Sequence, residues 1–168
     1  MFEPGDFVVN ANNGVCRIAE TIQMDLIGDG NMKPYFLLVP VGESTARVYI
    51  PVDTAETRIR KAITEEDAIR VIDSIPTIDE IRIASEKERE TKYKAAVRSC
   101  DPVQLFSIMK TLYHRKQTRI AQGKKSTAID ERYYKMAENQ LYAELAFVLG
   151  REKDDMQELI RERIETAM

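Results

Sequence analysis

The first 20 residues constrain this chain most, because they specify a β-hairpin whereas the later part of the sequence has a helical pattern. Pro4-Gly5-Asp6 is a turn sequence, and Phe7-Val8-Val9 is a run of strand-forming aromatic and β-branched residues. Asn12-Asn13-Gly14 tolerates the positive φ values of a hairpin turn, and the alternation from Val15 to Glu20 predicts the returning strand. We therefore expect a small β-module ahead of a helical one.

Further strand signals follow the hairpin. Tyr35–Val39 and Ala46–Ile50 are apolar runs, and glycine-containing turn clusters around Gly28 and Gly42 precede them. Four or five short strands within about 50 residues predict a small, curled barrel or half-barrel with an exposed edge.

The remainder of the chain predicts about five helices. Thr64, Asp101 and Thr127 are helix N-cap signals, whereas Pro76 and Gly150 mark helix ends. A highly charged helix is expected around residues 86–99. The helix after Thr127 has its predicted apolar stripe at Ile129, Tyr133, Met136, Ala137, Leu141, Leu145 and Val148. The fold class is thus α+β, with a β-domain over residues 1–60 and an all-α domain over residues 61–168.

Composition limits the cellular setting and the chemistry. No apolar run approaches the length of a membrane span, and no secretory leader is visible at the N-terminus. Cys16 and Cys100 lie far apart in different predicted modules, so we expect free thiols and a cytoplasmic protein. His114 is the only histidine and stands among cations, and Cys16 lies in a predicted strand. We therefore expect no enzyme activity, no metal site, no cofactor and no small-molecule substrate.

Positive charge is concentrated in one block. Residues 86–125 hold 11 Lys and Arg residues against four Asp and Glu residues, although the whole chain has a net charge of −3. This block suits contact with a phosphate backbone and contains no signal for base-specific recognition. The alternative is a solvated surface on which Glu88–Lys92 and Glu90–Lys94 are intrahelical pairs. We favour nucleic acid because no acidic partner is evident for Arg115, Lys116, Arg119, Lys124 or Lys125.

The order of several short motifs resembles the CarD/CdnL family along most of the chain. The matching residues of the β-module are Phe2, Gly5, Asp6, Val8, Val9, Asn13, Gly14, Val15, Tyr35, Leu37, Ile50 and Pro51. Those of the helical part are Tyr93-Lys94-Ala95, Leu112-Tyr113, Arg115 and the segment from Ala137 to Glu144-Leu145-Ala146. The resemblance implies a bacterial transcription regulator with an N-terminal Tudor-like (SH3-like) β-barrel, a domain shared with the transcription-repair coupling factor.

The resemblance also implies two partners. The N-terminal domain would bind the RNA polymerase β subunit by extending a sheet, through Met24, Leu26, Arg47, Tyr49 and Pro51. The helical domain would contact promoter DNA and stabilise the open complex. Its expected DNA-contacting residues are Arg89, Lys92, Lys94, Arg98, Arg115, Lys116, Arg119, Lys124 and Lys125.

One position departs from the family pattern. Some members carry a minor-groove tryptophan four residues before the motif tyrosine, whereas this chain has no tryptophan and has Arg89 at that place. Arg89 would act in the minor groove through its charge, or else this chain lacks the aromatic wedge that the tryptophan of those members inserts there. A different class of function stays open, a protein–protein adaptor whose helical domain binds another protein. The sequence does not decide between activation and repression at a given promoter.

Overall fold

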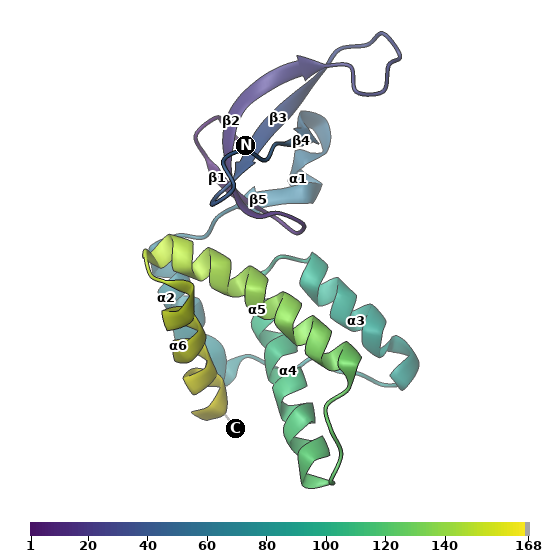
Figure 1. Cartoon of the computed structure of the whole chain (residues 1–168), viewed down its shortest axis with the longest axis vertical. Helices are drawn as coiled ribbons and strands as arrows, with labels where there is room; N and C mark the ends of the chain where they lie inside the picture. Colours follow the sequence, from purple (N-terminus) through teal and green to yellow (C-terminus); the bar gives the residue numbers. More distant parts are fainter. Residues whose placement is uncertain (167–168) are drawn as a thin grey trace. The chain divides into compact units, whose positions relative to one another are not determined.

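The computed structural model describes residues 1–166 (Figure 1). The chain divides into two compact units, Met1–Ala62 and a second unit that begins at Ile63. The sequence placed this division after Arg60. The first unit extends beyond that point because its last strand ends at Lys61.

The first unit is an antiparallel sheet of five strands in the order β4-β3-β2-β1-β5. The strands are β1 (Phe7–Asn10), β2 (Gly14–Met24), β3 (Lys33–Pro40), β4 (Val48–Pro51) and β5 (Ile59–Lys61). Gly14, the first residue of β2, has φ +68° and provides the predicted positive-φ position of the first hairpin.

The sheet is open, so the predicted Tudor-like barrel is not confirmed, whereas the predicted exposed edge is present. Within residues 1–166, β4 pairs with β3 and β5 pairs with β1, and no ladder joins β4 to β5. The connection between them is helical and contains η1 (Val52–Thr54) and the one-turn helix α1 (Ala55–Arg58). Both ends of the sheet therefore remain edges.

The core of the first unit lies on one face of this sheet. It contains Val8, Cys16, Ile18, Phe36, Leu38, Ile50, Ala55 and Ile59. Cys16 is fully buried, and burial raises the pKa of its thiol to about 11. The interpretation of Cys16 as a core residue is confirmed.

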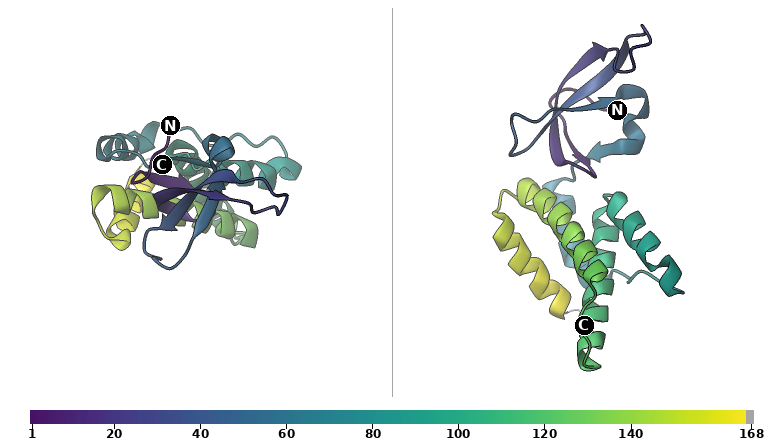
Figure 2. Two further views of the ribbon diagram at one scale, coloured as in Figure 1. Left: turned by 90° about the horizontal axis from the view of Figure 1, so that it is seen from above. Right: turned by 45° about the vertical axis from the view of Figure 1, so that its right-hand side comes forward.

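The second unit is helical. It contains α2 (Glu65–Ser74), η2 (Ile75–Thr77), α3 (Glu86–Arg98), α4 (Pro102–Ala121), α5 (Ala128–Leu149) and α6 (Lys153–Thr166). The Thr64 and Thr127 hydroxyls accept hydrogen bonds from the amides of Asp67 and Asp130, which confirms these N-caps. Helix α5 is central, since it packs against α2, α3, α4 and α6 (Figure 2).

The core of the second unit follows the predicted stripes only in part. Tyr133, Ala137, Leu141 and Leu145 of α5 are buried, as expected. Ile129 and Met136 are 44% and 42% exposed, so their assignment to the core is wrong. Both lie on α5, seven residues apart and thus on one side of the helix, and neither is among its buried residues. None of the described helices is long and apolar enough to cross a bilayer.

Candidate functional site

Strand β4 forms one edge of the sheet and carries two of the predicted polymerase-contacting residues. Tyr49 lies opposite Leu37 of β3, and Pro51 lies opposite Tyr35. Arg47 precedes the strand, and its guanidinium donates to the carbonyls of Ser44 and Ala46 at 2.6 and 2.9 Å. An edge strand of this kind can accept a further strand from another protein.

The other two predicted positions lie at the end of β2. Met24 is its last residue, whereas Leu26 lies in the following loop and is 56% exposed, so it is not part of a strand. Ile22 pairs with Tyr35 and Tyr35 with Pro51, which places these three residues on one face of the sheet. Met24, two residues after Ile22, shares that face, opposite the core.

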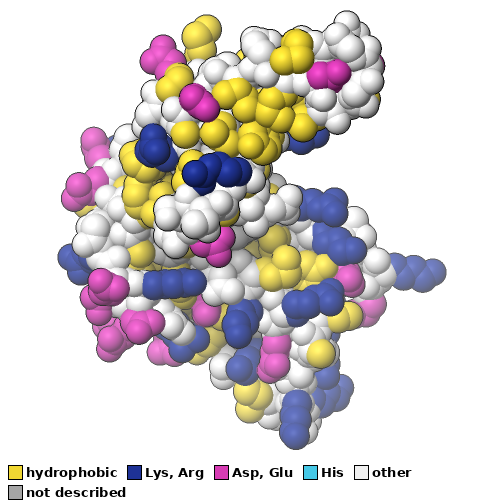
Figure 3. All heavy atoms as spheres, turned by 45° about the horizontal axis from the view of Figure 1, so that its top comes forward, with side chains coloured by type: hydrophobic (Ala, Val, Ile, Leu, Met, Phe, Trp, Pro, Cys, Tyr) yellow, Lys and Arg dark blue, Asp and Glu magenta, His cyan; other side chains and the backbone are white. Residues whose placement is uncertain are grey.

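Exposed hydrophobic side chains accompany this face. Tyr49 is 39% exposed, and the space-filling view shows hydrophobic side chains gathered over the first unit (Figure 3). An apolar surface beside a free strand edge is suited to binding protein rather than a charged polymer.

In the second unit, a shallow groove brings together Arg89, Arg115 and Arg119. Helices α3 and α4 and the segment around Ile81 line it, with His114, Thr118 and Gln122 beside the arginines. Glu80 is the acidic residue of the groove lining, and one of its oxygens lies 3.2 Å from Nδ1 of His114.

Two of these arginines are engaged in an internal network. Arg89 donates to both carboxylate oxygens of Glu86 and, at 3.0 Å, to the Tyr93 hydroxyl. Arg115 Nε donates to Oδ2 of Asp130 at 2.7 Å, and the Tyr93 hydroxyl donates to Oδ1 of the same carboxylate at 3.1 Å. The network therefore links α3, α4 and α5.

The network is buried at its Asp130 end and exposed at its Glu86 end, where the Glu86 side chain is 72% exposed. The Asp130 side chain is 5% exposed, and the Arg89 and Arg115 side chains are 19% and 21% exposed. Hydrogen bonds from Arg89 lower the pKa of Glu86 to about 2, and the charges of Arg89 and Arg115 add to this effect. The expectation that Arg115 lacks an acidic partner is wrong, because Asp130 and Glu86 both contact it.

Most cations of α3 also have acidic partners. Lys92 lies 3.4 Å from Glu88, and Lys94 lies 3.9 Å from Glu90, so the predicted intrahelical pairs exist. Lys92 also donates to the carbonyl of Arg82. Arg98 is exposed at the end of α3.

The loop between α4 and α5 presents a different group of cations. Arg119 Nε donates to the Lys125 carbonyl at 2.8 Å, which fixes the loop against the last turns of α4. Lys124 and Lys125 are exposed, and no carboxylate of residues 1–166 forms an ion pair with them. This group, Arg119, Lys124 and Lys125, is called the loop cations below.

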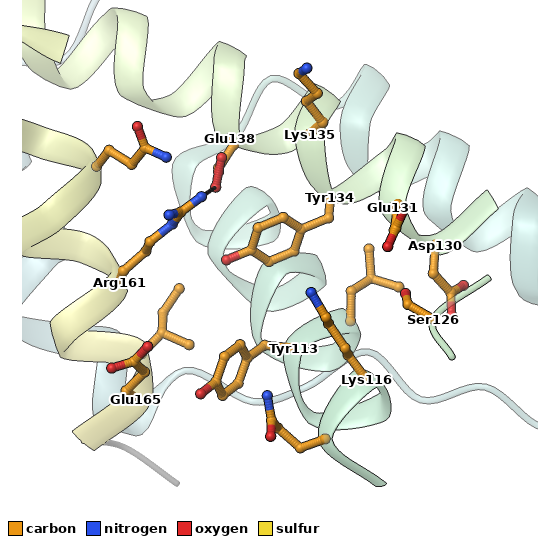
Figure 4. Close-up of a pocket in the computed structure, with 14 residues that line it drawn as sticks. Tyr113, Lys116, Ser126, Asp130, Glu131, Tyr134, Lys135, Glu138, Arg161 and Glu165 are labelled. Carbon is orange, nitrogen blue, oxygen red and sulfur yellow. Dashed lines mark hydrogen bonds and ion pairs between the residues drawn. The ribbon is translucent and has the colours of Figure 1, made fainter. Parts of the chain in front are cut away.

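Two basic residues of the block lie elsewhere. Lys110 is buried and donates to the carbonyls of Ile75, Pro76 and Ile78, so it does not belong to a cationic surface. Lys116 lines a separate cavity of about 560 Å³ between α4, α5 and α6 (Figure 4). That cavity has mixed charge, with Arg161 paired to Glu138, and burial raises the pKa of Tyr134 to about 12.

Comparison with known families bears on the first unit. Residues 2–63 match the family model of the CarD-like/TRCF RID domain. The first unit is therefore similar to this domain. No curated protein matches the chain.

The RID domain indicates interaction with RNA polymerase. Its matched span covers the whole open sheet, including the β4 edge and the face with Met24, Tyr49 and Pro51. The second unit lies beyond the RID domain, so its role is argued from its own residues.

Sequence reasoning missed the buried partner of Arg115. Helices α4 and α5 are joined by a short connection, and such a hairpin places residues near the end of α4 against those near the start of α5. That geometry was the available signal for Arg115 and Asp130. Within residues 1–166, no group of three or more His, Cys, Asp or Glu side chains is arranged to hold a metal ion.

Proposed function

We propose that this protein is a transcription regulator that binds the RNA polymerase β subunit through its RID domain and contacts promoter DNA through its helical unit. The observation that carries the proposal is the RID match over residues 2–63, together with the β4 edge and its exposed apolar face. The DNA contact would lengthen the lifetime of the open complex.

The polymerase contact is assigned to the β4 edge. Main-chain hydrogen bonds along an edge strand give affinity, and the side chains at alternate positions give specificity. Tyr49 and Pro51 alternate on the exposed face and are suited to the second role. Arg47 adds a charge at the start of the same strand.

The DNA contact is assigned chiefly to the loop cations. Lys124 and Lys125 are exposed and have no acidic partner among residues 1–166. The guanidinium groups of Arg89 and Arg115, by contrast, already donate hydrogen bonds within the protein, to Glu86, Tyr93 and Asp130. Arg98, Lys92, Lys94 and Lys116 would supply weaker, peripheral attraction. Contacts of this kind are independent of base sequence.

Tethering makes weak DNA contacts sufficient. Once the RID domain is bound to polymerase, the helical unit is held near the promoter at a high effective concentration. We expect poor binding to free duplex DNA and clear binding to polymerase–promoter complexes.

The test is the lifetime of promoter complexes with a charge-reversed loop. Lys124→Glu with Lys125→Glu should shorten the lifetime severalfold while polymerase affinity stays unchanged. Arg151→Glu with Lys153→Glu is the matched control, because it makes the same charge change at two exposed positions, one in the α5–α6 connection and one at the start of α6. Equal effects of the two double variants would contradict a local DNA contact.

One observation favours the alternative function, a protein–protein adaptor whose helical domain binds another protein. Three cations of α3, at positions 89, 92 and 94, are paired with glutamates of the same helix and are thus less available to phosphates. An unchanged complex lifetime with K124E/K125E, together with intact polymerase binding, would favour the adaptor. The proposal includes no catalytic role for His114 or Cys16.

A further inference from the structure

The loop that joins β2 to β3 is organised by one carboxylate. Asp25 Oδ1 accepts hydrogen bonds from the amides of Gly28 and Asp29 at 2.8 and 3.2 Å, and Oδ2 accepts one from the amide of Gly30 at 2.9 Å. Gly28 and Gly30 have φ values of +78° and +82°, which favour glycine. The loop conformation is therefore fixed by contacts within the loop itself.

This fixed loop exposes large apolar side chains. Leu26, Ile27 and Met32 are 56%, 72% and 61% exposed. Single exposed apolar side chains are common on protein surfaces, but three of them within seven residues of one loop are typical of an interaction site. Preorganisation of apolar side chains lowers the entropy cost of binding a partner.

We propose that the Asp25-anchored loop is a second contact of the RID domain with RNA polymerase, and that Ile27 and Met32 enter an apolar depression of the polymerase surface. The inference rests on the proposed function. It adds Ile27 and Met32 to Met24 and Leu26, the residues at the end of the β2–β3 hairpin that the family resemblance already implied in the polymerase contact.

Continuity with the β4 edge identifies the partner. The hairpin continues for two residue pairs beyond the pair Tyr35–Pro51, to Gln23–Pro34 and Met24–Lys33, and the loop lies at its end (Figure 1). Met24 shares the exposed face with Pro51. A protein docked along β4 on this face would therefore meet the projecting hairpin.

The charge of the loop argues against a membrane as the occupant. Residues 25–33 contain Asp25 and Asp29 against one cation, Lys33, so the loop has a net negative charge. Attachment to an anionic lipid surface relies on basic residues beside the apolar ones. Binding to an apolar protein surface does not require basic residues beside the apolar ones.

The test is the affinity of the full-length chain for purified bacterial RNA polymerase core enzyme. Ile27→Ser with Met32→Ser should weaken binding at least tenfold. Val41→Ser is the matched control, because Val41 is 47% exposed and lies just beyond the opposite end of β3. It should bind within twofold of the wild type.

A third variant tests the anchor. Asp25→Ala keeps Ile27 and Met32 but removes all three acceptor contacts, so it should also weaken binding and should speed hydrogen exchange at the Gly28 and Gly30 amides. Wild-type affinity in the I27S/M32S variant would overturn the inference and leave the proposed function standing. Failure of the wild-type chain to bind polymerase would overturn both. Loss of self-association or of phosphatidylglycerol-vesicle binding in I27S/M32S, with polymerase binding unchanged, would also overturn the inference.

Discussion

Replacing Arg115 by alanine should destabilise the helical unit, because Arg115 neutralises a buried carboxylate. Asp130 is 4% exposed overall and accepts one hydrogen bond from Arg115 and one from Tyr93. Removing one partner of a buried ion pair costs about 3–5 kcal/mol. The Arg115 side chain is 21% exposed, so solvent screens part of this pair, and we expect a loss of about 2–3 kcal/mol in the free energy of unfolding.

Urea denaturation followed by far-ultraviolet circular dichroism measures this loss, since most helical residues belong to the second unit. Lys116→Ala is the control, because it removes an adjacent exposed cation and should change stability by less than about 0.5 kcal/mol. The double variant R115A/D130A should be less destabilised than the sum of the two single variants.

The stability and the promoter-complex lifetime of R115A together decide whether Arg115 acts in folding or in DNA contact. If R115A unfolds with wild-type stability but shortens promoter-complex lifetime, Arg115 is a DNA contact and the network assigned to it is wrong. If R115A loses both stability and lifetime, only the loop cations can report on DNA contact, since Arg115 then acts through folding.

Three further outcomes are expected. The pKa of Glu86 is lowered in the folded state, so its ionised form stabilises the fold above the ordinary pKa of 4.5. That contribution is lost as the pH falls towards about 2. NMR titration should show the Glu86 carboxylate still charged at about pH 3.5, and Arg89→Gln should return its pKa towards 4.5. Cys16 should resist alkylation by iodoacetamide at neutral pH until urea unfolds the chain, because its thiol is buried and its pKa is about 11; rapid labelling of the native protein would contradict the core assignment. Lys110→Met should lower the free energy of unfolding by about 2 kcal/mol, because three carbonyls at the end of α2 and in the segment after it lose a charged donor; an unchanged urea midpoint would contradict this.

Local features of the fold were predictable from the sequence. The N-caps at Thr64 and Thr127 and the end of α5 at Gly150, with φ +63°, depend on side chains and backbone within one turn of the position concerned. The first hairpin was predictable for the same reason, since its turn chemistry lies within three residues.

Features that depend on distant pairing were not predictable. Closure of the sheet required a ladder between β4 and β5, and no short motif reveals whether two such strands meet. The apolar period of α5 identified a stripe but not how wide a stripe its neighbours would cover, and Ile129 and Met136 remained exposed. The division of cations into paired and unpaired groups likewise depended on contacts such as Arg115–Asp130, between different helices.

The inward engagement of Arg89 has a consequence for ionic strength. With its guanidinium held by Glu86 and Tyr93, and with no tryptophan in the chain, this position offers no ring to stack between bases. A DNA contact made only by lysines and arginines gains its free energy from displaced counterions and weakens steeply as salt rises. The proposed polymerase contact of the RID domain is mostly apolar, with Arg47 as its charged member, so it should weaken less with salt. Added salt should then release the helical unit from promoter DNA before the RID domain leaves polymerase.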